Sequence, residues 1–298
     1  MGTAGSDAVS AAVADLMSEA VEAQPTRMAL GYANENWRVV VSGQPLLLKI
    51  SPIGTNRDKV EAASRAQSMA RRTGAPVARE VLFDPACRHF DGRIVRLFEF
   101  LPGLHPTSKL TSPAATRRFF SSFGRAVATL HSARCDGFSS RIGATDTFAS
   151  WADYVTYRVP QIHDRGRTAA TLTEDEMETM FDQVLSIALA VSAVVEPALT
   201  HRDLYLDNLV ADDDAQLTGI LDFDNAEAWE PAADFVKLRW QVFPQFAGAE
   251  RAFFAGYHTM ASPLPSLEAR IKVAEILELS NHAIGARDRV TSRSLRPP

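Results

Sequence analysis

Two carboxylates and one carboxamide are closely spaced in the second half of the sequence. Asp203 and Asn208 lie five residues apart in the segment HRDLYLDN, and Asp222 follows fourteen residues later, at the end of an apolar run. A carboxylate can accept the proton of a reacting hydroxyl, and carboxylate and amide oxygens are ligands that suit Mg²⁺. Together they could support phosphoryl transfer from a nucleoside triphosphate to an alcohol. Taken alone, Asp203 could equally cap a turn or pair with Arg202.

The two segments together resemble the aminoglycoside phosphotransferase and choline kinase family, a branch of the protein-kinase-like fold. That family carries a His-x-Asp with Asn five residues after the Asp, and then an apolar run that ends in Asp. By position, the resemblance implies that Asp203 is the catalytic base and that Asn208 and Asp222 bind Mg²⁺. It also implies that His201 braces the catalytic loop and that Asp234 anchors this loop from the helix that follows.

Two positions depart from the family pattern. Arg202 stands where the small-molecule kinases usually have glycine, and Trp229-Glu230-Pro231 stands where Gly-Asp-Pro is common. Neither departure removes the base or a metal ligand. The resemblance spans roughly residues 28–235.

A lysine in the first half of the chain extends the resemblance. Lys49 lies in an apolar strand, just before a helix that holds Glu61. This arrangement resembles the family lysine that contacts the α- and β-phosphates and pairs with a helix glutamate. Two simpler interpretations are an edge-strand lysine that reaches water and a surface pair of Glu61 with Arg65, four residues on.

Two further segments are expected to bind the nucleotide. The loop at residues 31–36 falls where the family covers the phosphates, and it has one glycine, so backbone N–H groups and the amides of Asn34 or Asn36 would have to bind them. Glu99, Phe100 and Leu101 occupy the family's hinge, whose backbone groups bind the purine edge. The resemblance implies ATP or GTP, with Mg²⁺, as cofactors.

Acceptor recognition is expected in the second half of the chain. Carboxylates would suit the ammonium groups of an amine-bearing substrate, and aromatic rings could stack on sugars or a base. The candidate residues are Asp207, Asp224, Glu227, Trp229, Trp240, Glu275, Glu278, Asn281 and His282.

The pattern of apolar residues predicts an α+β protein with two lobes, as in the protein-kinase-like fold. Residues 1–102 would form an N-terminal nucleotide-binding lobe with a leading helix at 7–23, and residues 103–298 a larger, mainly helical lobe. The first lobe would hold a five-stranded antiparallel sheet and one inserted helix. The expected strands are 28–32, 37–42, 45–51, 78–83 and 93–98.

Helices account for most of the remaining expected elements. The inserted helix would begin with a capping box of Thr55 and Asp58 and end near Gly74. Later helices are expected at 114–132, 148–159, 174–195, 232–260 and 267–284.

Composition narrows the class of protein. Hydrophobic residues make up 46% of the chain and charged residues 22%, as in globular proteins. The net charge is −5 and no basic run is dense, so we expect no nucleic-acid partner. There is no basic residue before Arg27, and the apolar stretch 185–195 is too short to span a bilayer, so we expect no signal peptide and no membrane partner. We expect a cytoplasmic monomer or homodimer.

Three functional hypotheses follow. The first is an ATP-dependent O-phosphotransferase that modifies a hydroxyl of an antibiotic, aminoglycoside-like or otherwise amine-bearing, and so confers resistance. The second keeps the chemistry but takes a metabolite, such as a choline-like alcohol, a sugar or a glycated amine. The third is a catalytically degenerate nucleotide-binding protein, which the intact set Lys49, Asp203, Asn208 and Asp222 disfavours. Hydrolysis by two metal ions is disfavoured because the sequence lacks a second ligand cluster.

Overall fold

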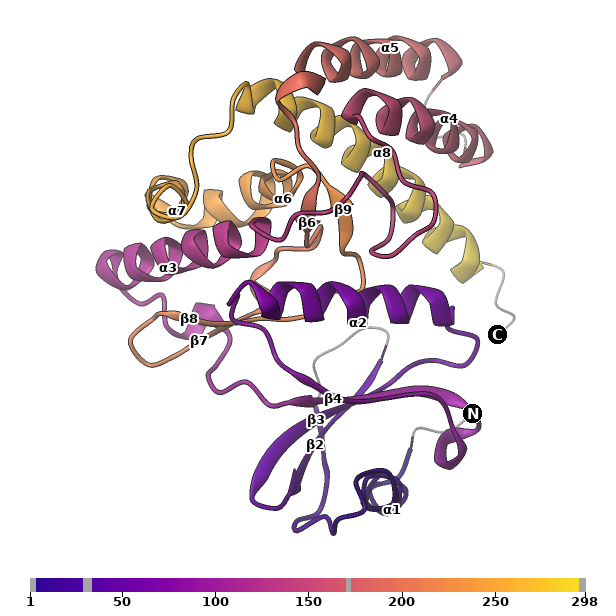
Figure 1. Ribbon diagram of the computed structural model, residues 1–298, viewed down its shortest axis with the longest axis vertical. Coiled ribbons are helices and arrows are strands. Elements are labelled where there is room, and N and C mark those ends of the chain that lie inside the picture. Colours follow the sequence, from indigo (N-terminus) through magenta and orange to yellow (C-terminus); the bar gives the residue numbers. More distant parts are fainter. Residues whose placement is uncertain (1–3, 29–33, 170–172, 295–298) are drawn as a thin grey trace.

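The computed structural model describes residues 4–28, 34–169 and 173–294, with side chains described as far as Ser280. Its first part is a five-stranded antiparallel sheet, as predicted (Figure 1). The strand order is β1-β2-β3-β5-β4. The strands are β1 (Thr26–Met28), β2 (Glu35–Val41), β3 (Gln44–Ile50), β4 (Glu80–Cys87) and β5 (Arg93–Glu99).

The β2–β3 hairpin shows how the local sequence sets the register. Ser42 and Gly43 both have positive φ, 48° and 72°, which is the type I′ turn that matches the twist of a two-residue hairpin. Alternate residues of β3 are buried, which places Leu46, Leu48 and Ile50 on one face of the sheet. Lys49 lies between two of these residues and therefore points to the opposite face.

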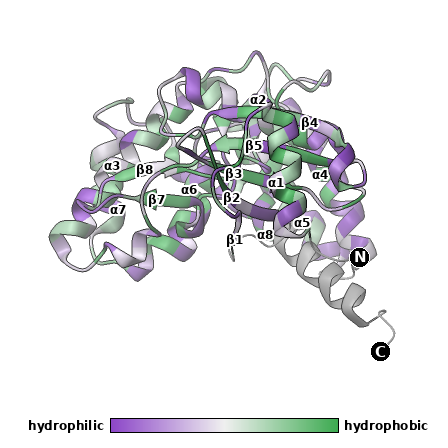
Figure 2. Cartoon of the chain, turned by 90° about the horizontal axis from the view of Figure 1, so that it is seen from below, coloured by the Kyte–Doolittle hydropathy of each residue, from purple (hydrophilic) through white to green (hydrophobic). Residues whose placement is uncertain are grey.

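Two helices flank this sheet. Helix α1 (Ser6–Met17) buries Val9, Ala12 and Val13 against the face that carries Leu46 and Leu48. Figure 2 shows α1 beside the sheet, whose strands carry both hydrophobic and hydrophilic residues. Helix α2 (Arg57–Arg72) lies on the other side, between the sheet and the helical part of the molecule (Figure 1).

Two predictions about these helices were wrong in detail. Helix α1 ends at Met17 rather than at residue 23, because Ser18 takes the left-handed conformation and closes the helix with bonds to Ala14 and Asp15 carbonyls. The N-cap of α2 is Asn56 rather than Thr55: Asn56 Oδ1 accepts a hydrogen bond from the Lys59 N–H at 3.1 Å. The Thr55 hydroxyl instead donates to the Pro52 carbonyl.

The remainder of the chain is mainly helical. Its α-helices are α3 (Pro113–His131), α4 (Trp151–Ala169), α5 (Glu174–Val191), α6 (Ala233–Lys237), α7 (Ala249–Tyr257) and α8 (Leu267–Ser294). Helices α3 and α7 cross so closely that a Cβ on Gly124 would lie 2.0 Å from the Phe253 carbonyl oxygen. Glycine on α3 is thus a packing requirement, and this crossing supports the rest of the lobe. The boundary of the lobes at residues 102 and 103 stays a prediction.

The long helix predicted at 232–260 is interrupted. Helix α6 continues as a π-helical segment, Leu238–Val242, and a 3₁₀ turn, Phe243–Gln245, before α7 begins after Gly248. Pro244 lacks an N–H and cannot continue a regular helix, and Gly248 has a φ of 79°. Helix α4 is longer than predicted and reaches Ala169, with Pro160 inside it.

Helix α5 with its following turn, Glu174–Val194, has the length and hydropathy of a membrane-spanning helix among the described residues. It is longer than the apolar stretch seen in the sequence. Its buried apolar side chains, which include Phe181, Val184 and Ala188, join the main hydrophobic core.

Two short antiparallel pairs hold the segments that could do chemistry. Strand β6 (Ala198–Thr200) pairs with β9 (Glu227–Trp229), and β7 (Leu209–Ala211) pairs with β8 (Leu217–Ile220). The loop that contains Asp203 and Asn208 therefore runs from β6 to β7, and Asp222 follows β8 directly.

Candidate active site

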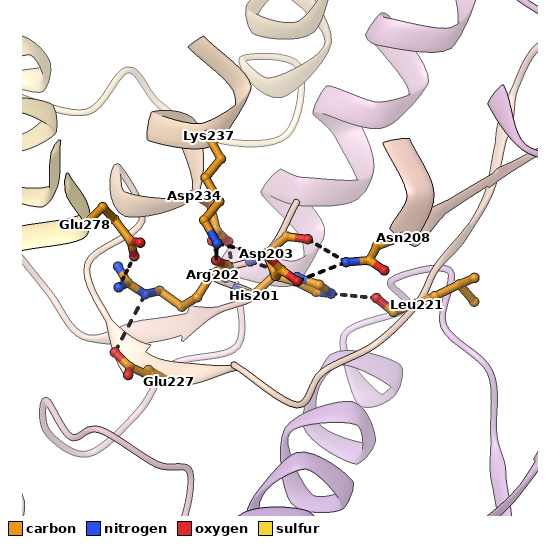
Figure 3. A network of polar contacts seen from close by, with 9 residues as sticks. All are labelled: His201, Arg202, Asp203, Asn208, Leu221, Glu227, Asp234, Lys237 and Glu278. Atoms are coloured by element: carbon orange, nitrogen blue, oxygen red, sulfur yellow. Dashed lines mark hydrogen bonds and ion pairs between the residues drawn. The ribbon is translucent and has the colours of Figure 1, made fainter. Parts of the chain in front are cut away.

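Asp234, on α6, binds the backbone of the β6–β7 loop. Its carboxylate accepts hydrogen bonds from the backbone N–H groups of His201, at 2.8 Å, and Arg202, at 2.6 Å (Figure 3). His131 Nε2 lies 3.0 Å from the same carboxylate, and its Nδ1 lies 3.0 Å from the Tyr257 hydroxyl. Burial alone would raise the pKa of Asp234, but the His131 hydrogen bond and charge outweigh it and hold the pKa below its ordinary value. A buried carboxylate thus fixes the loop.

His201 joins the two loops that carry the acidic residues. Its Nε2 lies 2.8 Å from the Leu221 carbonyl oxygen, and its Nδ1 accepts the Asp203 N–H at 3.3 Å. Nε2 therefore carries the proton in this arrangement, because a carbonyl oxygen can only accept. The ring also packs edge-on against Phe223, 4.7 Å between centroids. The position of His201 agrees with the bracing contact that the resemblance implied.

The Asp203 carboxylate is partly exposed to solvent, and each of its two oxygens accepts a hydrogen bond from a side chain. Lys237 Nζ donates to its Oδ1 at 2.8 Å, and Asn208 Nδ2 lies 3.3 Å from its Oδ2 (Figure 3). The side chain is 27% exposed, so a reacting hydroxyl could approach it. Lys237 also donates to the Arg202 carbonyl oxygen at 2.7 Å. The ammonium of Lys237 therefore fixes the orientation of the expected base.

Asn208 and Asp222 come from adjacent loops that are bonded to each other. The Leu221 N–H donates to the Asn208 carbonyl oxygen at 2.8 Å, and Asn208 Nδ2 donates to the Asp203 carbonyl oxygen at 2.8 Å. Since the amide nitrogen of Asn208 is used, its Oδ1 is the atom left for a cation. Asp222 has a φ of 63°, in the left-handed region, and its side chain is 40% exposed. Non-glycine residues in this region often belong to functional sites.

The donor set of this site fits Mg²⁺ bound together with phosphates. It offers hard oxygens from one carboxylate and one amide, and Mg²⁺ usually takes one or two protein carboxylates plus substrate phosphates. The described residues contain no cluster of three or more His, Cys, Asp or Glu side chains with metal-site geometry. An all-protein metal cage is therefore not what these residues form.

Lys49 pairs with Asp222 rather than with Glu61. Lys49 Nζ lies 3.3 Å from Asp222 Oδ1 across the boundary between sheet and helical part. Burial acts to raise the pKa of Asp222, but the charges of Lys49 and His201 and the Lys49 hydrogen bond outweigh it and lower the pKa. The site thus holds an ionised carboxylate beside an ammonium.

The predicted contact of Glu61 with Lys49 is wrong. Glu61 accepts a hydrogen bond from Arg57 at 2.6 Å and pairs with Arg65 at 3.7 Å, both one helical turn away on the surface of α2. The hydrogen bond from Arg57 lowers the pKa of Glu61. Local spacing of four residues favours such pairs over a contact across the cleft.

The remaining nucleotide candidates lie around Lys49 and at the end of β5. Asn36 lies opposite Lys49 in the β2–β3 register, and Asn34 precedes β2. Residues 31–33 of the predicted phosphate loop lie outside the described residues. The Glu99 carboxylate binds Arg79 at 2.9 Å, so its side chain is engaged on the surface.

Backbone bonds limit what the hinge can offer. The N–H groups of Glu99 and Phe100 donate to the carbonyls of Arg79 and Pro45, at 2.9 and 3.1 Å. The N–H of Leu101 has no such bond within the described part of the chain. Leu101 is therefore the hinge residue whose N–H could bind a purine edge.

A cavity of about 510 Å³ opens beside the β6–β7 loop. Three of the nine acceptor candidates line it, namely Asp224, Glu227 and Glu278. Lys237 and Arg202 line it too, which connects the cavity to Asp203 through the Lys237 ammonium. A volume of this order suits a small-molecule ligand.

The acidic candidates in the cavity are bound to arginines. Arg202, only 6% exposed in its side chain, lies 3.6 Å from Glu227 and forms an ion pair with Glu278 (Figure 3). Arg96 pairs with Asp224 at 3.3 Å. Burial raises the pKa of Glu227, although the charges of Arg202 and Arg158 oppose the rise. These carboxylates already have cationic partners inside the protein.

The structure places the other acceptor candidates elsewhere. Trp229 is buried beneath the Arg202 guanidinium, 3.3 Å from its ring centroid, so the prediction that it stacks on a ligand was wrong. Trp240 Nε1 donates to Glu275 at 2.8 Å, and Asp207 contacts His105 at 3.0 Å. The candidates Trp240, Glu275 and Asp207 do not line the cavity. The side chains of Asn281 and His282 lie outside the described residues.

Sequence reasoning missed Lys237 and the basic lining of the cavity. Lys237 follows Asp203 by 34 residues and reaches it only because α6 packs under the loop. The other basic residues of the lining are Lys59, Arg141, Arg158 and Arg165. They come from α2, α4 and the connection between α3 and α4, and no local spacing in the sequence links them.

The fold and the site place the protein in the class of kinase-like phosphotransferases. Its features are a five-stranded antiparallel sheet, a mainly helical remainder, and a loop with Asp203 and Asn208 beside the loop that carries Asp222. The chain belongs to the phosphotransferase enzyme family, whose model matches residues 25–269. None of the curated proteins compared with the chain matches it.

Solved structures share this fold at low sequence identity. A putative aminoglycoside phosphotransferase from Ralstonia eutropha JMP134 superposes with a TM-score of 0.71 at 17% identity, covering 96% of this chain and 90% of that one. A putative fructosamine-3-kinase from Haemophilus somnus 129PT gives 0.66 at 15% identity, with 97% of each chain covered. A thermostable mutant of aminoglycoside phosphotransferase APH(4)-Ia, in complex with AMP-PNP and hygromycin B, gives 0.65 at 14% identity, covering 97% and 99%. At these identities the likeness shows the fold.

Proposed function

We propose that this phosphotransferase moves the γ-phosphoryl group of ATP to a hydroxyl of a small molecule, with Mg²⁺ as the metal. The observation that carries the proposal is the arrangement of Asp203, exposed and oriented by Lys237, beside the ion pair of Lys49 and Asp222. Support also comes from the family assignment and from the similar structure that holds AMP-PNP. A degenerate nucleotide-binding protein would not need an oriented base.

Each residue has a role that its position supports. Asp203 accepts the hydroxyl proton as the acceptor oxygen bonds to the γ-phosphorus and the bond to the bridging oxygen of ADP breaks. Lys237 holds Asp203 in place. Asn208 Oδ1 and the Asp222 carboxylate would hold Mg²⁺, which neutralises charge on the phosphates. Lys49, the ammonium beside Asp222, would bind phosphate oxygens.

Two substrate classes are candidates. The names of similar structures, which include a complex with hygromycin B, support an antibiotic as the acceptor and hence a role in resistance. A metabolite is the second candidate, and one similar structure is a putative fructosamine-3-kinase. The engagement of Asp224, Glu227 and Glu278 by arginines disfavours a polyamine antibiotic, because its ammonium groups would compete with these arginines for the carboxylates.

Nucleotide binding tests the shared part of this proposal. Mg·ATP at about 100 times its dissociation constant should stabilise the protein by about 2.7 kcal/mol. Asp203→Ala should keep this stabilisation and lose turnover by orders of magnitude, because it removes the base and no metal ligand. Thermal unfolding and ADP release measure the two effects. Absence of any Mg·ATP effect on the wild-type protein would contradict the proposal.

Expression in a susceptible bacterium separates the two substrate classes. Cells that carry the wild-type protein, or Asp203→Ala as the matched control, are challenged with aminoglycoside, peptide and nucleoside antibiotics. Protection that depends on Asp203 supports the antibiotic class. Equal sensitivity of the two strains to every compound favours the metabolite class.

A further inference from the structure

We infer that the acceptor carries an anionic group, a carboxylate or a phosphate, and that the basic side of the cavity beside Asp203 binds it. The inference rests on the proposed function, since it names the substrate class of the same site. It differs from the polyamine substrate that the acidic residues of the sequence suggested.

The charge of the cavity lining is the first observation. Among the residues whose side chains are described, six cationic side chains and three carboxylates line the cavity. The cations are Lys59, Arg141, Arg158, Arg165, Arg202 and Lys237. An excess of positive charge around a partly enclosed space concentrates the field there and attracts anions. This local excess contrasts with the net charge of −5 of the whole chain.

The second observation is which of these charges are already compensated. The three carboxylates of the lining, Asp224, Glu227 and Glu278, face Arg96 and Arg202 inside the protein. Lys237, a further cation of the lining, is bound to Asp203. Asp203 does not itself line the cavity. The acidic groups are thus committed to structural partners.

The third observation concerns three of the four cations that remain, namely Lys59, Arg141 and Arg158. Neither Lys59 nor Arg141 forms a side-chain ion pair or hydrogen bond with any residue whose side chain is described. Arg158 lies over the Tyr154 ring at 6.0 Å from the centroid. Its charge acts on Glu227, but within the same part of the chain it forms no ion pair or hydrogen bond with a carboxylate. Guanidinium groups bind carboxylates and phosphates through two parallel hydrogen bonds, so Arg141 and Arg158 are suited to hold such a group.

The position of these residues relative to Asp203 makes the arrangement useful for transfer. Arg202 and Lys237 form the wall next to the catalytic loop, whereas Arg141 and Arg158 come from the α3–α4 connection and from α4. An acceptor whose acidic end binds Arg141 and Arg158 can extend its hydroxyl toward Asp203. A polyamine in the same cavity would place ammonium groups among these cations, and this repulsion selects against it.

Anion binding tests the inference without requiring turnover. Inorganic sulfate is titrated at constant ionic strength into protein saturated with Mg·AMP-PNP, so that the nucleotide phosphate site is filled, and heat is measured. We expect sulfate to bind the wild-type protein and the double variant Arg141→Gln, Arg158→Gln to bind it at least tenfold more weakly. Arg167→Gln is the matched control, because Arg167 lies on the same helix, pairs with Glu174 at 3.8 Å and does not line the cavity. Failure of sulfate to bind, or equal binding by the double variant, overturns the inference.

Acceptor preference provides the second test. Pairs that differ by one acidic group, such as glucose with glucuronate and glycerol with glycerol 3-phosphate, are compared with kanamycin and hygromycin B by ADP release. Acidic members should be preferred at least tenfold in kcat/KM, and Arg158→Gln should raise their KM while kcat stays within about twofold.

The outcomes separate this inference from the proposed function. A polyamine with the highest kcat/KM, improved by Arg158→Gln, overturns the anionic acceptor and leaves the kinase intact. Protein that binds no Mg·AMP-PNP overturns the proposed function itself. If none of these compounds is phosphorylated, the sulfate titration decides.

Discussion

Lys237 is expected to determine how fast the enzyme works, and Lys237→Met removes its charge with little change in shape. The ammonium lies 2.8 Å from Asp203 Oδ1 and 2.7 Å from the Arg202 carbonyl oxygen, and its side chain is only 10% exposed. At an effective dielectric constant of about 20, the charge attraction at this distance is about 6 kcal/mol. Desolvation offsets much of it, and hydrogen bonds to charged groups contribute about 1.5–3 kcal/mol net.

Loss of that contribution should appear mainly in kcat. If the 1.5–3 kcal/mol is lost from the positioning of Asp203, kcat falls about 10- to 160-fold. KM for ATP should change by less than about threefold, because Lys237 contacts neither Lys49 nor Asp222. Lys237→Arg should restore part of kcat, since a guanidinium can also donate to both oxygens.

Steady-state kinetics by ADP release measures both constants, and thermal unfolding with Mg·AMP-PNP confirms that the variant folds and binds nucleotide. Lys272→Met is the matched control, because Lys272 is an exposed residue of α8 whose ammonium pairs with Glu275, at 3.5 Å, and does not contact the catalytic loop among the described residues. Unchanged kcat in Lys237→Met would refute the positioning role. An equal fall in the control would show that the effect is not specific to Lys237.

Three further predictions concern the scaffold of the site. Asp234→Asn should lower the free energy of unfolding by about 3 kcal/mol, since it disturbs a buried, charged partner of His131 and two loop N–H groups; a loss under about 0.5 kcal/mol in urea unfolding would contradict this. Because the pKa of Asp222 is lowered in the folded protein, its stabilising effect is present above its ordinary pKa and is lost as pH falls through the lowered value. The stability difference between wild type and Asp222→Asn should therefore shrink on acidification, and a difference independent of pH would argue against the Lys49 ion pair. Gly124→Ala should destabilise the protein by about 1–3 kcal/mol in thermal unfolding, because its Cβ would collide with a backbone carbonyl; a neutral effect would show that α3 and α7 do not cross this closely.

The sequence predicted the two acidic loops because their chemistry is encoded in short spacings. Asp203 and Asn208 lie five residues apart on one loop, and an apolar strand delivers Asp222 to the next loop, so local order alone brings these side chains close. The five-stranded sheet was predicted for a similar reason, since alternation of apolar residues and a Ser-Gly turn act locally. The first expected strand, 28–32, lies outside the described residues except for Met28, and β1 is Thr26–Met28.

What the sequence did not reveal depends on contacts between distant segments. Lys237 reaches Asp203 from a helix 34 residues later in the sequence, and Glu278, which pairs with Arg202, lies on α8, later still in the sequence. The acidic acceptor candidates looked available in the sequence because nothing local shows that arginines bind them. The prediction for Glu61 was wrong for the opposite reason. Glu61 pairs with Arg57 and Arg65, which are close in the sequence, rather than with Lys49 on the sheet.

Single-turnover transfer from γ-labelled ATP to an acceptor identified by ADP release tests the central claim most directly. Asp203→Asn keeps the size of the side chain and removes its ability to accept a proton. We predict that this variant binds Mg·ATP like the wild type but forms labelled product at least about 10²-fold more slowly, as expected for the loss of general base catalysis. Product formation at the wild-type rate by Asp203→Asn would contradict the role of Asp203 as the base and, with it, the mechanism built on this loop.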